Sequence, residues 1–126
     1  MQQAPQRKRV LIVEDDIDTL VAFGRALTSF GVHGVPACSC ADAVDAVAMV
    51  GGVHAVVADL HLPDGNGIKL AGDIREAFDC RVAIMSGDPA PVGGLPAGID
   101  FWLQKPVGLP RLREVVEALT LDRRSA

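Results

Sequence analysis

The sequence predicts an α/β fold, a doubly wound parallel sheet of five strands in the order 2-1-3-4-5. Short apolar runs alternate along the chain with segments of helical periodicity, which is the pattern of repeated βα units. The runs are continuously apolar, as is typical of parallel strands that are buried on both faces. Right-handed crossovers favour a parallel doubly wound sheet. The order 2-1-3-4-5 makes the first and third strands neighbours, and ligands bind at their carboxyl ends.

The chain has 126 residues, 49% of them hydrophobic, which suits one domain with a full core. We expect the domain over residues 9–122, with a flexible N-terminal segment over 1–8 and a C-terminal tail over 123–126. The net charge of −4 gives no basic surface for nucleic acid, and no apolar run is long enough for a membrane span or a signal peptide. Three cysteines form no disulfide framework, so a cytoplasmic protein with free thiols is expected.

The first half of the chain predicts two strands and two helices. The strands are Arg9–Val13 and Val32–Ala37. The helix between them ends at a glycine, and its apolar residues recur at helical spacing, namely Leu20, Phe23, Leu27 and Phe30. A second helix is expected over Ala41–Val50, with Val44 and Val47 facing the core.

The second half predicts three further strands, over Ala55–Asp59, Arg81–Met85 and Asp100–Gln104. A helix over Ile68–Phe78 follows the first of these strands. The last helix has Pro110 at a first helical position, and its inner face is formed by Leu112, Val116 and Leu119. Each strand is thus followed by a helix, except after the fourth.

The segment Pro89–Gly98 interrupts this pattern where a fourth helix is due. It contains three prolines and three glycines, both of which disfavour a regular helix. We therefore expect the fourth helix to be absent, short or irregular, with at most one turn in this segment.

Acidic residues follow the first and third strands. Glu14, Asp15 and Asp16 come directly after the first strand, and Asp59 ends the third. Because the topology brings these two strand ends together, we expect Glu14, Asp15 and Asp59 to bind Mg²⁺ or Mn²⁺ through carboxylate oxygens. Asp16 is expected to be structural, with Asp16 or Asp18 capping the next helix.

A hydroxyl and an ammonium group are predicted at the same edge of the sheet. Ser86 follows the fourth strand and Lys105 follows the fifth. A carboxylate such as Asp59 can act as a nucleophile toward phosphorus and form an aspartyl phosphate. Lys105 and Ser86 would then hold two phosphoryl oxygens, and Mg²⁺ the third.

In type and order these residues resemble the motifs of response-regulator receiver domains of two-component signalling. The resemblance covers about residues 8–122 and rests on four segments: Val13-Glu14-Asp15-Asp16, Asp59 with Leu62-Pro63-Asp64-Gly65 and Gly67, Met85-Ser86-Gly87, and Lys105-Pro106. It implies a flavodoxin-like receiver fold of the single-domain type. Gly67 and Pro106 would be structural, with a cis peptide bond before Pro106. Ser86 would follow the phosphoryl group as a switch, and Lys105 would pair with its oxygens.

The resemblance further implies that Asp59 is the phosphoacceptor for a histidine kinase or a histidine phosphotransfer protein. Mg²⁺ would be held by Glu14, Asp15, Asp59 and the backbone carbonyl of His61. His61 and Asp88 occupy positions that tune the dephosphorylation rate in the family. The family's output and dimerisation surface includes the fourth helix, so a homodimer of this chain would use a non-standard surface.

Trp102 stands where the family usually has a Tyr or Phe switch, directly after Phe101. Neighbouring residues of a strand point to opposite faces, so both aromatic rings cannot be buried in the same way. One interpretation is that one ring is buried and the other covers exposed apolar surface. The other interpretation is that Trp102 is a bulky switch that reports phosphorylation.

The leading hypothesis is a stand-alone phosphoacceptor that signals to an unknown downstream protein, by protein–protein contact or onward phosphotransfer. It would not be an enzyme, beyond autocatalytic phosphotransfer and autodephosphorylation. One alternative is a degenerate receiver that binds a partner without phosphorylation, although the complete set of site residues argues against it. The other is a phosphatase with an aspartyl nucleophile, resembling the haloacid dehalogenase family, which needs a second acid where this chain has His61.

Overall fold

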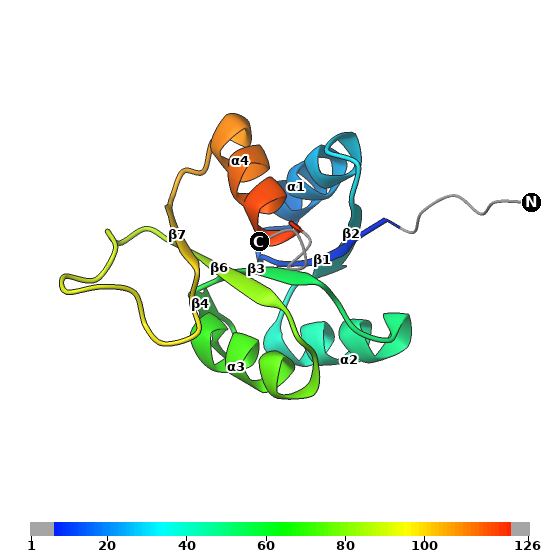
Figure 1. The fold of residues 1–126 in the computed structure, drawn as a ribbon, viewed down its shortest axis with the longest axis horizontal. Coiled ribbons are helices and arrows are strands. Elements are labelled where there is room, and N and C mark those ends of the chain that lie inside the picture. Colours follow the sequence, from blue (N-terminus) through cyan, green and yellow to red (C-terminus); the bar gives the residue numbers. More distant parts are fainter. Residues whose placement is uncertain (1–6, 122–126) are drawn as a thin grey trace, which may run out of the picture.

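Five parallel strands form the centre of the computed structural model, which describes residues 7–121 (Figure 1). The elements in chain order are β1 (Arg9–Val13), α1 (Ile17–Ser29), β2 (His33–Ala37), α2 (Cys40–Val50), β3 (Ala55–Asp59), β4 (His61–Leu62), β5 (Gly65–Asn66), α3 (Gly67–Ala77), β6 (Arg81–Ser86), β7 (Phe101–Gln104) and α4 (Leu109–Leu119). Most of the 1–8 segment and all of the 123–126 tail lie outside the described residues. Within 7–121, no helix has both the length and the apolar character needed to cross a membrane.

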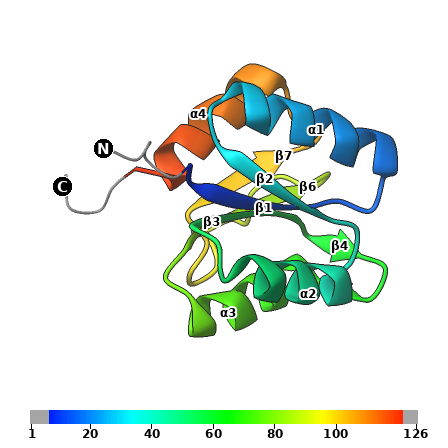
Figure 2. The ribbon, with the colours of Figure 1, turned by 90° about the vertical axis from the view of Figure 1, so that its right-hand side faces the viewer.

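The main sheet has the order β2-β1-β3-β6-β7, and every neighbouring pair is parallel. This is the predicted 2-1-3-4-5 order, because β6 and β7 are the fourth and fifth strands of this sheet. Figures 1 and 2 show α1 and α4 on one face of the sheet and α2 and α3 on the other. The fold is therefore doubly wound, and the carboxyl ends of its strands meet at one edge.

The strands are buried because helices cover both faces of the sheet. All five residues of the central strand β3 are buried. Successive side chains of β3 face opposite layers: Val56 and Ala58 pack on the side of α2 and α3, and Ala55 and Val57 on the side of α1 and α4. Asp59 ends this strand, so its carboxylate stands at the margin of the core.

Side-chain caps begin three helices near the carboxyl edge of the sheet. The Asp16 carboxylate accepts a hydrogen bond from the Thr19 backbone N–H at 3.2 Å, so Asp16 caps α1 as predicted. Ser39 caps α2 and Asn66 caps α3 in the same way. Each helix therefore starts close to the end of the strand that precedes it.

A short hairpin between β3 and α3 was not predicted. His61 pairs with Asn66, and Leu62 with Gly65, in the antiparallel pair β4–β5. Two-residue strands leave almost no periodic signal in a sequence. The pairing of these two strands fixes the backbone of the segment that follows Asp59.

Two expectations about side-chain direction and helix start were wrong. Val47 is buried as predicted, but Val44 is 52% exposed. α4 begins at Leu109, with Pro110 inside its first turn rather than at the first position. The apolar residues of the last helix, Leu112, Val116 and Leu119, are buried as predicted.

Phe101 and Trp102 lie on opposite faces of β7, as the strand period requires. The interpretation that one ring is buried and the other covers exposed apolar surface is wrong about the buried ring, because both side chains are half-buried. Trp102 packs with the core on the side of α2 and α3, and Phe101 packs on the side of α1 and α4. β7 is the last strand of the sheet, so neither of its faces is fully covered.

The connection between β6 and β7 contains no helix, in agreement with the prediction for Pro89–Gly98. Residues 87–95 are exposed without interruption, and the segment extends away from the body of the domain at the left of Figure 1. The chain is anchored again at Asp100, whose side chain accepts a hydrogen bond from the Val82 backbone N–H at 2.8 Å. The fourth helix is thus replaced by an exposed loop.

Candidate functional site

Asp59 lies at the carboxyl end of β3, between the ends of β1 and β6. Its side chain is only 8% exposed. The backbone of α3 approaches it closely: a Cβ atom on Gly67 would lie 2.1 Å from the Asp59 carbonyl oxygen. Only glycine fits at position 67 with the hairpin and the start of α3 in this arrangement.

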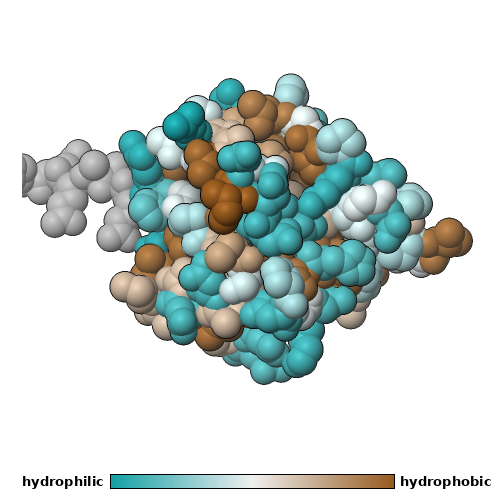
Figure 3. Space-filling model, turned by 180° about the vertical axis from the view of Figure 1, so that it is seen from behind, coloured by the Kyte–Doolittle hydropathy of each residue, from teal (hydrophilic) through white to brown (hydrophobic). Residues whose placement is uncertain are grey.

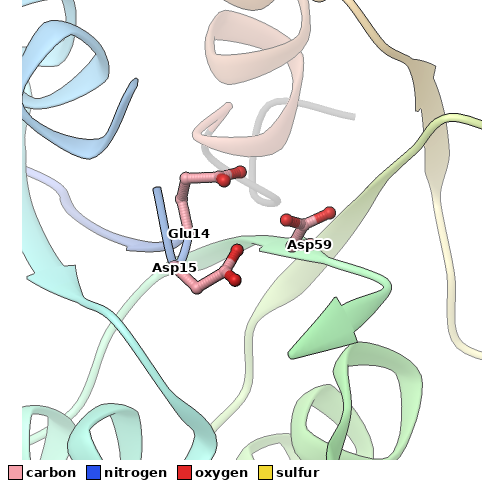
Figure 4. Close-up of side chains that lie close together, drawn as sticks. All are labelled: Glu14, Asp15 and Asp59. Atoms are coloured by element: carbon pink, nitrogen blue, oxygen red, sulfur yellow. The ribbon is translucent and has the colours of Figure 1, made fainter. Parts of the chain in front are cut away.

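Three carboxylates share the space at this edge (Figure 4). Glu14, Asp15 and Asp59 each offer one oxygen, and these oxygens all lie within 4.8 Å of one another. Glu14 and Asp59 are buried, whereas Asp15 is exposed. An all-oxygen donor set of this kind fits a hard divalent cation such as Mg²⁺ or Mn²⁺, which would also offset the repulsion between the carboxylates.

Lys105 supplies a positive charge to the same cluster. Its Nζ donates hydrogen bonds to Asp59 Oδ2 at 2.7 Å and to Glu14 Oε2 at 3.1 Å. Burial alone would lower the pKa of Lys105, but these two hydrogen bonds and the charges of both carboxylates raise it overall. Lys105 is therefore a charged ammonium group that bridges two of the three acids.

The environment of Glu14 opposes its ionisation. Burial raises the pKa of Glu14 above its ordinary value, and the charge of Asp59 adds to this shift. The hydrogen bonds from Lys105 and from the Asp16 backbone N–H act in the opposite direction. Additional positive charge in the cluster would favour the ionised form of Glu14.

Ser86 lies at the end of β6, next to the Asp59 strand, and is buried. Its Oγ accepts a hydrogen bond from the Asp88 backbone N–H at 3.0 Å. The Lys105 backbone N–H donates a hydrogen bond to the Ser86 carbonyl oxygen at 2.7 Å, but within residues 7–121 no hydrogen bond joins the Ser86 hydroxyl to Asp59 or Lys105. The sheet thus brings Ser86 to the predicted edge. Its hydroxyl is hydrogen-bonded to Asp88, at the start of the connection formed by residues 87–100.

The remaining predicted residues surround the cluster. Trp102 Nε1 donates a hydrogen bond to the Asp88 carbonyl oxygen at 3.0 Å, so Asp88 contacts both Ser86 and Trp102 through its backbone. His61 is exposed on the hairpin that follows Asp59. The peptide bond before Pro106 is cis, as the resemblance implied.

A hollow of about 610 Å³ opens beside Lys105, between α1 and the connection from β7 to α4. Its lining is mostly apolar and consists of Asp18, Thr19, Ala22, Phe23, Lys105, Pro106 and Val107. Lys105 therefore contacts the acidic cluster and also forms part of the wall of this open concave surface.

Asp64 has a role that the sequence did not predict. Its carboxylate accepts hydrogen bonds from the backbone N–H groups of Cys40 and Ala41, at 2.8 and 3.0 Å. These bonds lower the pKa of Asp64 and fasten the hairpin to the first turn of α2. The Pro-Asp-Gly turn was visible in the sequence, but its partner, 23 or 24 positions away, was not.

The fold is a doubly wound parallel sheet, and its carboxyl edge carries a buried aspartate, two further acids and a lysine. This combination defines the class of receiver modules. The chain belongs to the response regulator receiver domain family, whose model matches residues 10–117. The structure of a CheY-like response regulator receiver domain from Methylobacillus flagellatus is similar, with a TM-score of 0.77 and 28% identity, over 90% of this chain and 99% of that one. A two-component response regulator from Clostridium difficile shares the fold, with a TM-score of 0.80 at 24% identity, over 95% of this chain and 100% of that one.

Two curated relatives illustrate the sequence similarity. The transcriptional regulatory protein PrrA of Mycobacterium tuberculosis is 34% identical in an alignment of 122 positions that covers 93% of this chain and 52% of that protein. The two-component response regulator ARR2 of Arabidopsis thaliana is 28% identical in an alignment of 126 positions that covers 96% of this chain and 19% of that protein. The chain thus spans about half, or less, of the length of these relatives.

Proposed function

We propose that this chain is a phosphoacceptor receiver, in which Asp59 takes a phosphoryl group from a phosphohistidine in the presence of Mg²⁺. The main supporting observation is the cluster itself: Asp59 shares a space with two further carboxylates and has the Lys105 ammonium at 2.7 Å. The donor would be a histidine kinase or a histidine phosphotransfer protein. The hollow of about 610 Å³ beside Lys105 is a candidate contact surface for such a donor.

In the transfer, an Asp59 oxygen forms a bond to phosphorus while the bond between phosphorus and the donor's imidazole nitrogen breaks. The electron pair of the broken bond stays on that nitrogen. Lys105 would exchange its hydrogen bond to Asp59 for one to a phosphoryl oxygen. Ser86 would turn its hydroxyl away from the Asp88 N–H and donate it to another phosphoryl oxygen.

Glu14, Asp15, Asp59 and the backbone carbonyl of His61 would hold Mg²⁺ or Mn²⁺. The bound cation supplies positive charge next to the phosphoryl oxygens. Glu14, which is buried, would give one ligand in a fixed position, whereas Asp15 is open to solvent. His61 and Asp88 each stand two positions after a site residue and are the candidates for setting the lifetime of the aspartyl phosphate.

The names of the relatives, a transcriptional regulator and a two-component response regulator, support a place in a phosphorelay. We further infer that the chain works in the cytoplasm and passes its signal to a downstream protein by contact or by onward phosphotransfer. It would catalyse only its own phosphotransfer and autodephosphorylation. A homodimer would use a non-standard surface, because a loop replaces the fourth helix.

Incubation with acetyl phosphate, followed by mass spectrometry of the intact protein, tests the proposal. We expect a mass gain of one phosphoryl group that requires Mg²⁺ and is abolished in Asp59→Asn. The control Glu117→Gln alters an exposed carboxylate on α4 and keeps the gain. If neither acetyl phosphate nor phosphorylated histidine kinases modify Asp59, phosphorylation-independent binding is favoured, and steady hydrolysis of p-nitrophenyl phosphate would favour a phosphatase.

A further inference from the structure

The outward side of α2 is unusually apolar for a surface helix. Only Asp42 and Asp45 are charged in this helix, and its remaining residues are alanine, valine, methionine and one cysteine. Several of the apolar residues are exposed: Ala41, Val44, Ala48, Met49 and Val50. A helix that packs against a sheet normally places polar residues on its outer side. In Figure 3, where α2 lies at the lower left, tan and brown atoms reach the surface.

These exposed side chains border a groove between α2 and α3. A hollow of about 210 Å³ has Val44 and Ala48 on one wall and Ala77 on the other, above Ile74 and Phe78. A second hollow of about 260 Å³ shares Val44 and Asp73 with the first and continues to the β4–β5 hairpin. The groove therefore follows both helices along most of their length, with apolar residues at its base.

The charges beside the groove are mainly negative. Two carboxylates, Asp64 and Asp73, line the hollows. Asp45 and Glu76 are further exposed acids on α2 and α3, and Arg75 is an exposed base on α3. Lys69 is the basic residue in the lining of the two hollows, and it lies 3.7 Å from Asp73. The groove is thus apolar at its base, with excess carboxylates along its edges.

We propose that the α2–α3 groove binds an amphipathic helix of a partner protein, whose apolar face enters the groove and whose flanking lysines or arginines face the carboxylates. Two parallel walls with apolar residues at helical spacing suit a helix better than an extended strand. A second copy of α2 is disfavoured, because it would bring Asp42 and Asp45 against the same acidic edges. This surface lies on a different face of the domain from the hollow beside Lys105, and binding to it does not depend on the chemistry of Asp59.

The test uses an amidated peptide of about 14 residues, roughly four helical turns, with leucine and lysine at helical spacing. Binding is followed by amide chemical shifts of the full chain in saturating Mg²⁺, which reduces binding of the peptide to the acidic cluster. We expect the shift changes to be confined to α2, α3 and the β4–β5 hairpin. A peptide with glutamate in place of lysine should not bind.

Val44→Lys should weaken binding about tenfold, because it removes an apolar contact and adds a like charge. Val21→Lys is the matched control, since Val21 is 48% exposed on α1 and Val44 is 52% exposed on α2. Ala48→Lys, in the same wall of the groove, should repeat the effect of Val44→Lys. Shift changes centred on α1, α4 or the acidic cluster would overturn the proposal, as would equal effects of Val44→Lys and Val21→Lys.

Discussion

Lys105 Nζ lies 2.7 Å from Asp59 Oδ2, although the two residues are 46 positions apart in the chain. The same ammonium group reaches Glu14 at 3.1 Å. Three carboxylates and one ammonium leave a formal charge of −2 in the cluster (−3 + 1). A divalent cation bound in this cluster would therefore compete with Lys105 for the carboxylates of Glu14 and Asp59.

Lys105→Met should tighten the binding of Mg²⁺. Loss of the ammonium changes the formal charge of the cluster from −2 to −3 and frees two carboxylate oxygens. We expect a gain of about 1 kcal/mol, or roughly fivefold in Kd, measured by isothermal titration calorimetry. Lys69→Met, which removes an exposed lysine on α3, should leave the Kd unchanged. Weaker binding in Lys105→Met would show that the lysine supports the cation site instead of competing with it.

Gly67→Ala should destabilise the fold, by about 2–4 kcal/mol in urea unfolding. The new Cβ would lie 2.1 Å from the Asp59 carbonyl oxygen, so the backbone at the acceptor strand must move. Gly72→Ala is a control in the same helix, because a Cβ there has nothing within 4 Å. This second variant should be more stable than the native protein, by about 0.5–1 kcal/mol. Equal stability of the two variants would contradict the close approach at position 67.

His54 should make the stability of the fold fall in mild acid. Burial lowers the pKa of His54, with the charges of Lys8 and Arg9 adding to the shift, while its Nδ1 accepts a hydrogen bond from the Arg9 N–H at 2.9 Å. The unfolded chain therefore binds a proton at His54 more tightly than the folded chain does. The contribution of neutral His54 to the free energy of unfolding is complete above about pH 6.5, and it is lost as the pH falls toward the pKa of His54 in the folded chain.

The measurement is the melting temperature of the native protein and of His54→Asn between about pH 5 and pH 8. Asparagine retains a hydrogen-bond acceptor but does not titrate in this range. We expect the melting temperature of the native protein to fall more steeply with acid than that of the variant. Parallel curves would mean that another group controls this pH dependence. His33→Asn, at an exposed histidine, is the matched control and should behave as the native protein does.

Trp102 should report assembly of the site, because it is the single tryptophan of the chain. Ser86 Oγ, the Asp88 backbone and Trp102 Nε1 form a continuous series of hydrogen bonds. When Mg²⁺ and beryllofluoride, which stands in for the phosphoryl group, occupy the site, Ser86 should release the Asp88 N–H. We expect a change in Trp102 fluorescence that is absent in Asp59→Asn and reduced in Ser86→Ala. An unchanged spectrum with beryllofluoride bound would exclude coupling between the site and β7.

The sheet and the acidic edge could be predicted because each depends on strong signals. Uninterrupted apolar runs identify buried parallel strands, and the βα order then determines which strand ends are neighbours. The order of the strands alone therefore brings together Glu14, Asp15, Asp59 and Lys105. The direction of the Ser86 hydroxyl could not be predicted, because it depends on a side-chain rotation that the strand period does not fix.

Other errors have local causes. Val44 was expected to face inward, but α2 is apolar on nearly all sides, so its periodicity does not distinguish the buried face. Phe101 and Trp102 are both half-buried, because β7 is an edge strand and its faces are only partly covered. The bond between Asp64 and the start of α2 joins residues more than 20 positions apart, which local patterns do not reveal.

The loop that replaces the fourth helix also has a practical consequence for protein engineering. Residues 87–95 are exposed without interruption, and Val92 near their centre is fully exposed. The entropy cost of closing a loop rises slowly with its length, and exposed loop tips accept insertions readily. A peptide tag or a small folded module inserted after Val92 would be tethered close to Ser86 while leaving the sheet intact. The domain is therefore a suitable framework for a genetically encoded reporter of the phosphorylation proposed at Asp59.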